Sequence, residues 1–283
     1  MKSAPPVAPL VPKKKAPHLL KKAFQGMRVN SIILVNAGSL VGTTAVTSLL
    51  GFVYWWLAAR AFPPAVVGFV SAAISAMTLL GTFALLGLGT LLLGELPQQR
   101  GREASLISTA LILVGGAGGL LGLAFAVAAP HISADFRALD ASIGNRTLFA
   151  LGVSLTAITL ALDDVLIGLF RGELQLWRNG LFAALKLAAL LAVSLWVSHV
   201  VGLTIYATWV IGNIGSLVFL TVYMLVRKGW GGRSYLPQWG LVRKLGLPAL
   251  RHHLLNVTLQ APALILPVLV TVLLSVSVNG WFY

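Results

Sequence analysis

Three charged residues inside long apolar stretches are the first candidates for chemistry in this sequence. Asp163 and Asp164 lie within the stretch from Thr147 to Phe170, and Lys186 is the one charge between Asn179 and Val226. Because a charge in lipid is costly, such residues usually pair with one another or line a pathway for ions or substrates. We therefore treat all three as candidates for a site.

The spacing of these charges predicts that they meet. Asp163 is the eighth residue counted back from Phe170, the end of its stretch, and Lys186 is the eighth residue of the next stretch, which starts at Asn179. At 1.5 Å per residue, both side chains reach about 10–12 Å into the membrane from the turn between two helices. We expect an ion pair between Lys186 and either Asp163 or Asp164, as a structural staple or as part of a transport cavity. The other aspartate must find a second donor, accept a proton or face water, because successive helix residues point about 100° apart.

Arg60 and two prolines complete the set of candidate residues. Arg60 ends the first apolar stretch ahead of Phe62-Pro63-Pro64, where it either anchors the helix at the membrane surface or faces a cavity. Pro262 and Pro267 free backbone carbonyls and permit a bend in the last apolar helix. Broken helices of this kind often line transport pathways, and a plain kinked helix is the alternative.

The composition excludes several classes of protein. Hydrophobic residues make up 58% of the 283 residues and charged residues only 10%, against about 25% in a soluble domain, so a soluble globular protein is excluded. The net charge of +14 does not indicate nucleic acid, because the charges stand between apolar stretches rather than on a polar domain. There is no cysteine, and the five histidines show no zinc spacing. No enzyme motif is present, so we expect no metal, no cofactor and no enzymatic activity.

Seven apolar stretches predict an all-α polytopic membrane protein. A bilayer core needs about 20 residues of helix, and strands are disfavoured because the stretches do not alternate between apolar and polar residues. The expected spans are 31–59, 66–93, 106–129, 147–170, two spans within 179–226, and 254–278. Glycine pairs that allow close helix packing stand at Gly38 and Gly42, Gly115 and Gly119, and Gly118 and Gly122.

Basic residues predict the orientation and the division of the chain. Seventeen of the 21 Lys and Arg residues fall on the side of the N-terminus and three on the other side, which places the N-terminus in the cytoplasm. We expect a basic tail with an interfacial helix over 1–30 and a six-helix lobe over 31–226. A basic amphipathic connector would follow over 227–253, and a seventh helix over 254–283. The tail and the connector predict binding to anionic lipids.

Several stretches resemble the polysaccharide flippases of bacteria. The likeness is carried by Phe52–Gly68, by Leu86-Gly-Leu-Gly89 with Glu95-Leu-Pro97, by the hairpin from Leu162 to Leu187, and by Ala261-Pro262 with Leu266-Pro267. These O-antigen and exopolysaccharide flippases belong to the multidrug/oligosaccharidyl-lipid/polysaccharide exporter superfamily. One departure is Gly94-Glu95, where the family often has a basic residue before Leu-Pro.

The resemblance implies two six-helix lobes in the bacterial plasma membrane that work by alternating access. Such a protein moves an isoprenoid-diphosphate-linked oligosaccharide from the inner to the outer leaflet for polysaccharide or lipopolysaccharide biosynthesis. Cationic residues in its cavity meet the diphosphate, and Lys186 and Arg60 fit that role best. Membrane proteins of polysaccharide assembly are further expected partners. The length implies a first lobe plus the opening helix of a second, truncated after the seventh helix, and a chain that does not transport by itself.

Two other functions remain open from the sequence. A cation-coupled multidrug exporter would have the same architecture, with more aromatic and acidic residues in its cavity. A membrane scaffold that binds polysaccharide-assembly enzymes without transporting anything is the third possibility. An embedded glycosyltransferase is disfavoured, because the longest outer segment, His131–Arg146, is too short for a catalytic domain.

Overall fold

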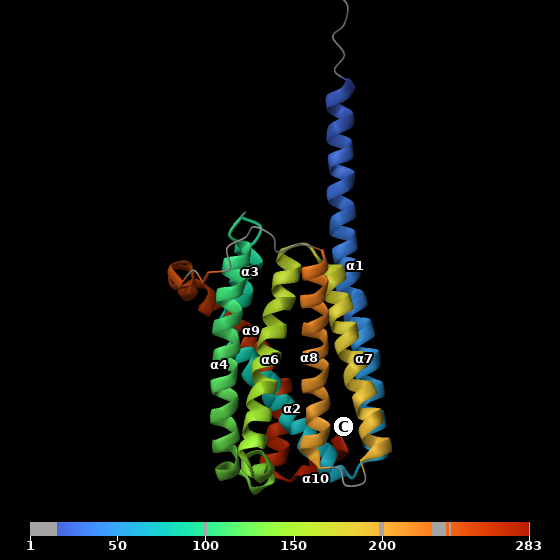
Figure 1. Ribbon diagram of the computed structural model, residues 1–283, viewed down its shortest axis with the longest axis vertical. Helices are drawn as coiled ribbons and strands as arrows, with labels where there is room; N and C mark the ends of the chain where they lie inside the picture. The colour runs from blue at the N-terminus through green and yellow to red at the C-terminus, as the bar shows by residue number, and fades with distance from the viewer. Residues whose placement is uncertain (1–15, 99–100, 198–200, 228–235, 238, 283) are drawn as a thin grey trace, which may run out of the picture.

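The computed structural model describes residues 16–98, 101–197, 201–227, 236–237 and 239–282. These residues form helices and no strand (Figure 1). The helices are α1 (Ala16–Ala61), α2 (Pro64–Ala84), α3 (Leu88–Glu95), α4 (Glu103–Ile132), η1 (Ala134–Phe136), α5 (Arg137–Asp140), α6 (Ile143–Gly168), α7 (Gly172–Trp196), α8 (Gly202–Val226), α9 (Trp239–Leu273) and α10 (Val276–Phe282).

Within the described residues, six helical segments are long and apolar enough to cross a membrane, and Val257–Leu273 is a shorter apolar helix. The prediction of an all-α polytopic membrane protein is therefore confirmed. The second predicted span, 66–93, is not one helix as expected. Leu86 and Gly87 have left-handed backbones with φ of 50° and 78°, and this pair ends α2 and starts α3. Two such residues in succession cannot continue a right-handed helix.

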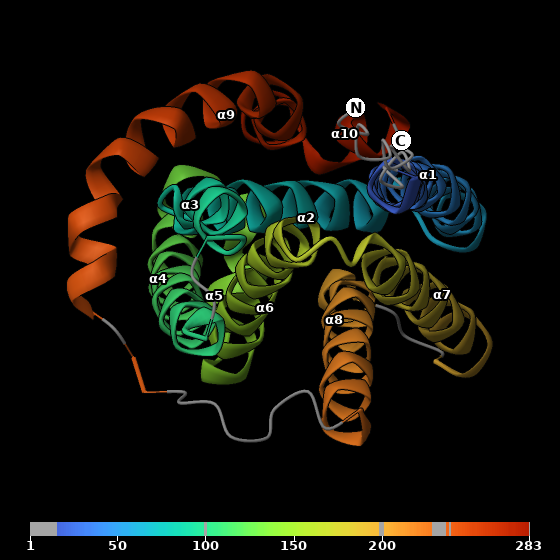
Figure 2. The same ribbon diagram turned by 90° about the horizontal axis from the view of Figure 1, so that it is seen from above.

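Both predicted interfacial helices join the spans that follow them. Residues 16–30 continue directly into α1, which extends beyond the other helices in Figure 1. The connector from Trp239 onward and the seventh span form the single helix α9. Figure 2 shows that α9 is strongly curved and passes around the outer side of α3 and α2. The predicted tail over 1–15 and the first part of the connector, 228–235, lie outside the described residues.

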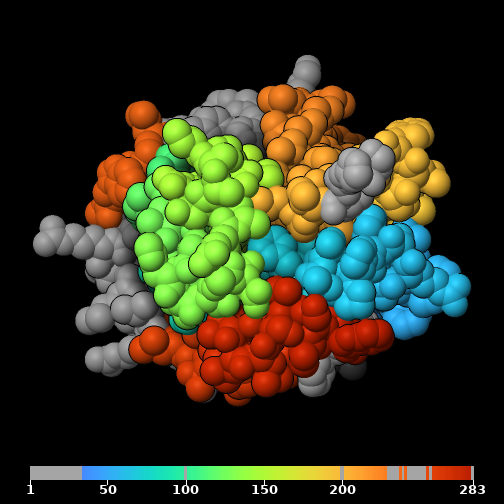
Figure 3. All heavy atoms as spheres, turned by 90° about the horizontal axis from the view of Figure 1, so that it is seen from below, coloured from blue at the N-terminus to red at the C-terminus, as the bar shows by residue number. Residues whose placement is uncertain are grey.

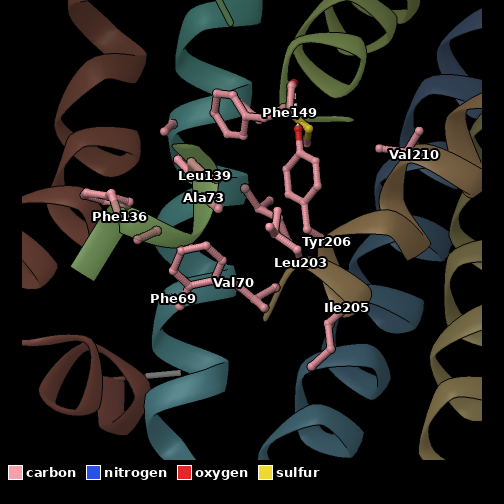
Figure 4. Close-up of a cluster of buried hydrophobic side chains, with 14 of the residues drawn as sticks. Phe69, Val70, Ala73, Phe136, Leu139, Phe149, Leu203, Ile205, Tyr206 and Val210 are labelled. Carbon is pink, nitrogen blue, oxygen red and sulfur yellow. Dashed lines mark hydrogen bonds between the residues drawn. The ribbon is translucent and has the colours of Figure 1, made fainter. Parts of the chain in front are cut away.

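The helices form two groups that meet along α2, α6 and α8 (Figure 2). In one group α7 packs between α1 and α8, and in the other α4 packs on α6 while α2 lies between α6 and α9. A row of aromatic rings lies inside the second group and reaches α8. The rings of Phe69, Phe136, Phe125, Phe149 and Tyr206 follow one another at centroid distances of 5.5–6.4 Å. Figure 4 shows most of this core, with Phe69 on α2 and Tyr206 on α8.

A short C-terminal helix closes one end of the bundle. The Asn279 amide of α10 donates hydrogen bonds to the carbonyl of Gly68, the hydroxyl of Ser71 and the hydroxyl of Thr271, at 2.8–3.0 Å. A side chain at Gly68 would collide with the backbone of Val276, so only glycine permits this approach of α10 to α2. In Figure 3 the red C-terminal residues lie against the cyan residues around the start of α2.

Close packing of α4 on α6 depends on the predicted glycines. A Cβ at Gly122 would lie 2.8 Å from Cα of Ala150, and a Cβ at Gly118 would lie 3.1 Å from Cα of Ser154. The packing role is therefore confirmed for these two residues. Gly38 on α1 has nothing within 4 Å, so the prediction is wrong there.

We expect Gly122→Ala to destabilise the protein by about 1–3 kcal/mol, because the added methyl forces α4 and α6 apart. Gly116→Ala on the same helix is the control, since a Cβ there meets nothing within 4 Å. That control should be neutral or stabilising by up to about 1 kcal/mol from helix propensity. Thermal unfolding in lipid nanodiscs measures both. Equal effects of the two substitutions would contradict the packing role.

Candidate functional site

An ion pair between α6 and α7 lies near the turn that joins them. Nη2 of Arg178 donates hydrogen bonds of 2.7 Å to both carboxylate oxygens of Asp163. The Asn179 side chain donates a further hydrogen bond of 2.9 Å to Oδ1 of Asp163. The side chain of Arg178 is only 2% exposed. The buried positive charge of Arg178 is thus balanced by the partly buried negative charge of Asp163.

The predicted ion pair between Lys186 and one of the two aspartates is wrong, because α7 separates from α6 soon after the turn that joins them. Beyond this point α7 packs along α1 and α8 (Figure 2). The ammonium of Lys186 accordingly lies against aromatic rings of α1, α7 and α8. The apolar stretch in the sequence starts at Asn179, but α7 begins at Gly172, so Arg178 is already inside the helix. A buried arginine at this position is the residue that sequence reasoning missed.

Lys186 instead lies among aromatic side chains from three helices. Its Nζ is 3.7 Å from the ring centroid of Trp209 on α8, 4.9 Å from that of Phe182 on α7 and 5.2 Å from that of Tyr54 on α1. The hydroxyl groups of Tyr54 and Thr208 are 2.9 Å apart and join α1 to α8 beside it. Lys186 is 5% exposed, and cation–π contacts of this kind replace part of the lost hydration. We call this group the lysine cage.

Asp164 lines a separate pocket with a volume of about 240 Å³. Its carboxylate lies against Gly89 of α3, where a Cβ would collide with it. The pocket also receives Gln175 from α7 and His253 and Gln260 from α9. Among the described residues, Asp164 forms no ion pair. We call this space the acidic pocket.

A larger and basic pocket of about 840 Å³ lies where α1, α7 and the end of α8 meet. Arg171 and Arg227 contribute its positive charges, and Glu173 contributes one negative charge. The guanidinium of Arg227 lies 5.6 Å from the ring centroid of Tyr223, and Phe170 and Trp177 add two further aromatic side chains. We call this the basic pocket. Sequence reasoning treated its arginines only as markers of orientation.

The remaining candidate residues lie apart from these pockets. Arg60 ends α1, with its guanidinium 4.6 Å from the ring centroid of Trp56. Pro262 and Pro267 lie in α9, the first exposed and the second buried. Asp163 and Asp164 therefore line the same pocket. Lys186, Arg60 and the two prolines lie elsewhere. The functional roles of all six residues remain predictions.

We expect Arg178→Met to destabilise the protein by up to about 3–5 kcal/mol, because it leaves the partly buried charge of Asp163 without its ion-pair partner. Arg171→Met, which removes an exposed arginine seven residues earlier, should change the stability by less than about 0.5 kcal/mol. Chemical unfolding in mixed micelles compares the two variants. If both variants unfold alike, the ion pair does not stabilise the hairpin.

Lys186→Met should behave in the opposite way. Because the buried ammonium has no carboxylate beside it within the part of the chain that the structure describes, a neutral side chain of similar volume should leave the stability unchanged or raise it by up to about 2 kcal/mol. The same unfolding assay measures it. A loss as large as that of Arg178→Met would show that the lysine cage is a structural element.

Comparison with known proteins identifies the family. The sequence matches the family model described as polysaccharide biosynthesis protein over residues 33–278. Among solved structures, the crystal structure of MATE in complex with MaD5 has a TM-score of 0.58 at 13% identity. The crystal structure of MATE in complex with MaD3S has a TM-score of 0.55 at 14% identity. Both alignments cover 79% of this chain and 53% of the other.

The structural likeness concerns the fold, and the chain spans about half the length of these solved chains. Curated proteins gave no match. The match to the family model covers most of the sequence, in agreement with the resemblance seen in its motifs. The chain belongs to the polysaccharide biosynthesis protein family.

Proposed function

We propose that this chain is part of a transporter that moves a lipid-diphosphate-linked oligosaccharide across the plasma membrane for polysaccharide biosynthesis. The observation that carries the proposal is the basic pocket, where Arg171 and Arg227 stand at one end of the helix bundle. Its membership of the polysaccharide biosynthesis family supports the substrate class. Because the chain spans about half the length of the solved MATE chains, transport is proposed for the complete assembly.

The basic pocket fits the headgroup of such a lipid in charge and in shape. Arginine binds phosphate oxygens through paired hydrogen bonds, and Arg171 and Arg227 line the same space. The exposed ring of Trp177 lies beside them and offers a flat apolar surface to the first sugar. A volume of about 840 Å³ lies within the range of pockets that hold drug-sized ligands.

The distribution of basic residues supports a position of this pocket at the cytoplasmic side, where lipid-linked sugars are assembled. Both arginines belong to the segments that carry the excess of Lys and Arg. Lys186 lies deeper and is covered by its aromatic cage, so the basic pocket is the place of first contact. Lys186 would meet the diphosphate only after the substrate has moved further into the lobe.

A multidrug exporter is the second candidate for this fold, and the charge of the basic pocket disfavours it for cationic drugs. Two arginines against Glu173 leave a positive space, which repels a lipophilic cation. The same pocket favours a diphosphate. Competition between the two kinds of ligand therefore separates the hypotheses.

We expect purified protein to bind geranylgeranyl diphosphate more tightly than geranylgeraniol. Replacing both Arg171 and Arg227 by Gln should weaken that binding by about tenfold or more, because charge-assisted hydrogen bonds contribute about 1.5–3 kcal/mol each. Glu173→Gln should strengthen it, because it removes a like charge from the pocket. Tritiated lipid in nanodiscs provides the measurement.

Arg137→Gln is the matched control, since this exposed arginine lies in α5, away from the basic pocket. It should leave the affinity unchanged. Equal affinity of the double variant and the unaltered protein would contradict the proposal. Displacement of the lipid by ethidium at the same site would favour the multidrug hypothesis.

A further inference from the structure

The turn between α6 and α7 places an aromatic side chain next to a cation at the edge of the basic pocket. Phe170 and Arg171 are consecutive residues between the candidate membrane spans Ile143–Gly168 and Gly172–Trp196, and both line this pocket. Because each of these helices is long enough to cross the membrane, the turn between them lies at its boundary. An apolar surface and a charged surface therefore meet at the point where lipid gives way to water.

Phe170 has a backbone conformation that phenylalanine rarely adopts. Its φ is 55°, in the left-handed region that crowds the Cβ of every residue except glycine. Its N–H donates a hydrogen bond to the carbonyl of Ile167 at 2.9 Å. The N–H of the next residue, Arg171, donates to the carbonyl of Leu166 at 2.8 Å. Helix ends with this pair of hydrogen bonds usually have glycine at the left-handed position, so phenylalanine there costs stability that glycine would not.

The ring of Phe170 gains little from packing within the protein. The residue is 60% exposed, so its burial does not explain why phenylalanine stands at a strained position. Trp177, which is 68% exposed, lines the same pocket, and Val35 and Met224 add further apolar side chains. Strained residues are found mainly at functional sites, where the conformation serves binding or catalysis. These observations point to an apolar ligand group that covers the ring.

The positive charges of the basic pocket adjoin this apolar surface. Nη1 of Arg171 donates a hydrogen bond of 3.8 Å to Sδ of Met224, which directs the guanidinium toward α8. Arg227 follows three residues after Met224, at the end of α8, and lines the same pocket. The arginines therefore stand on the α8 side of the pocket, and Phe170 stands beside them at the end of α6. An amphiphile with a charged head and an apolar chain matches this arrangement.

We propose that Phe170 binds the first isoprene units of the lipid diphosphate and thereby selects lipid-linked diphosphates over free ones. This role of Phe170 rests on the proposed function, in which Arg171 and Arg227 hold the diphosphate. The chain begins directly at the diphosphate, so its first units lie within reach of the residue that precedes Arg171. Covering an exposed ring with an apolar chain is favourable, because both surfaces leave water. Phenylalanine has no hydrogen-bonding group for a sugar hydroxyl, which favours the chain over the first sugar as its partner.

Substitutions at position 170 separate the ring from the backbone strain. Phe170→Ala and Phe170→Gly both remove the ring, but only glycine relieves the left-handed backbone. Phe170→Gly should therefore unfold about 2–4 °C higher than Phe170→Ala in lipid nanodiscs. Leu86→Gly is the matched control for binding, because Leu86 is the other described residue besides glycine with a positive φ, 50°, and it lies outside the basic pocket.

Binding of tritiated geranylgeranyl diphosphate to the protein in nanodiscs tests the proposal. We expect Phe170→Ala and Phe170→Gly to weaken this binding alike, by about fivefold or more, because both lose the apolar contact with the chain. Leu86→Gly should leave the affinity unchanged. Inorganic diphosphate, used as a competitor, should bind the unaltered protein and both variants at position 170 equally, because it has no chain to contact the ring.

The double variant of Arg171 and Arg227 distinguishes a failure of this role from a failure of the proposed function. If Phe170→Ala binds the lipid diphosphate unchanged while the double variant loses it, the role of Phe170 is overturned and the proposed function stands. An equal loss for inorganic diphosphate in Phe170→Ala would show that Phe170 only positions the arginines, which also overturns the isoprenoid contact. A loss in Phe170→Ala without any effect of the double variant would support the isoprenoid contact and contradict the proposed function.

Discussion

The ion pair between Asp163 and Arg178 is the interaction on which the arrangement of the membrane lobe depends. A charge within the membrane must meet a partner, and Arg178 is the partner that the turn between α6 and α7 brings within 2.7 Å. Beyond this ion pair, α7 separates from α6 and packs on α1 and α8. The first charge of the hairpin is therefore satisfied before its two helices part.

The other charges of the lobe take their roles from this separation. Lys186 is carried away from the aspartates and reaches Trp209, Phe182 and Tyr54 in the lysine cage. Asp164 stays behind and faces α3 and α9 across the acidic pocket. One stretch of sequence thus supplies a neutral pair, an isolated cation and an isolated carboxylate. Isolated charges inside a membrane protein are energetically costly, and they are usually retained for function rather than for stability.

Much of the fold was predictable because lipid leaves the backbone few options. Apolar stretches of sufficient length must be helices, and these were found close to their expected bounds. The break between α2 and α3 was not predictable, since Leu86 adopts a left-handed backbone inside an apolar stretch. One contact of the lysine cage was predictable from the sequence, because Phe182 stands four residues before Lys186 on the same face of one helix. Trp209 and Tyr54 come from distant helices, so only tertiary packing places them there.

The central claim is that Arg178, and not Lys186, balances Asp163. Two double-mutant cycles measured by unfolding in lipid nanodiscs test it most directly, one between positions 163 and 178 and one between 163 and 186. The account predicts a coupling energy of about 1–3 kcal/mol for the first pair and less than about 0.5 kcal/mol for the second. Strong coupling between 163 and 186 with none between 163 and 178 would contradict it.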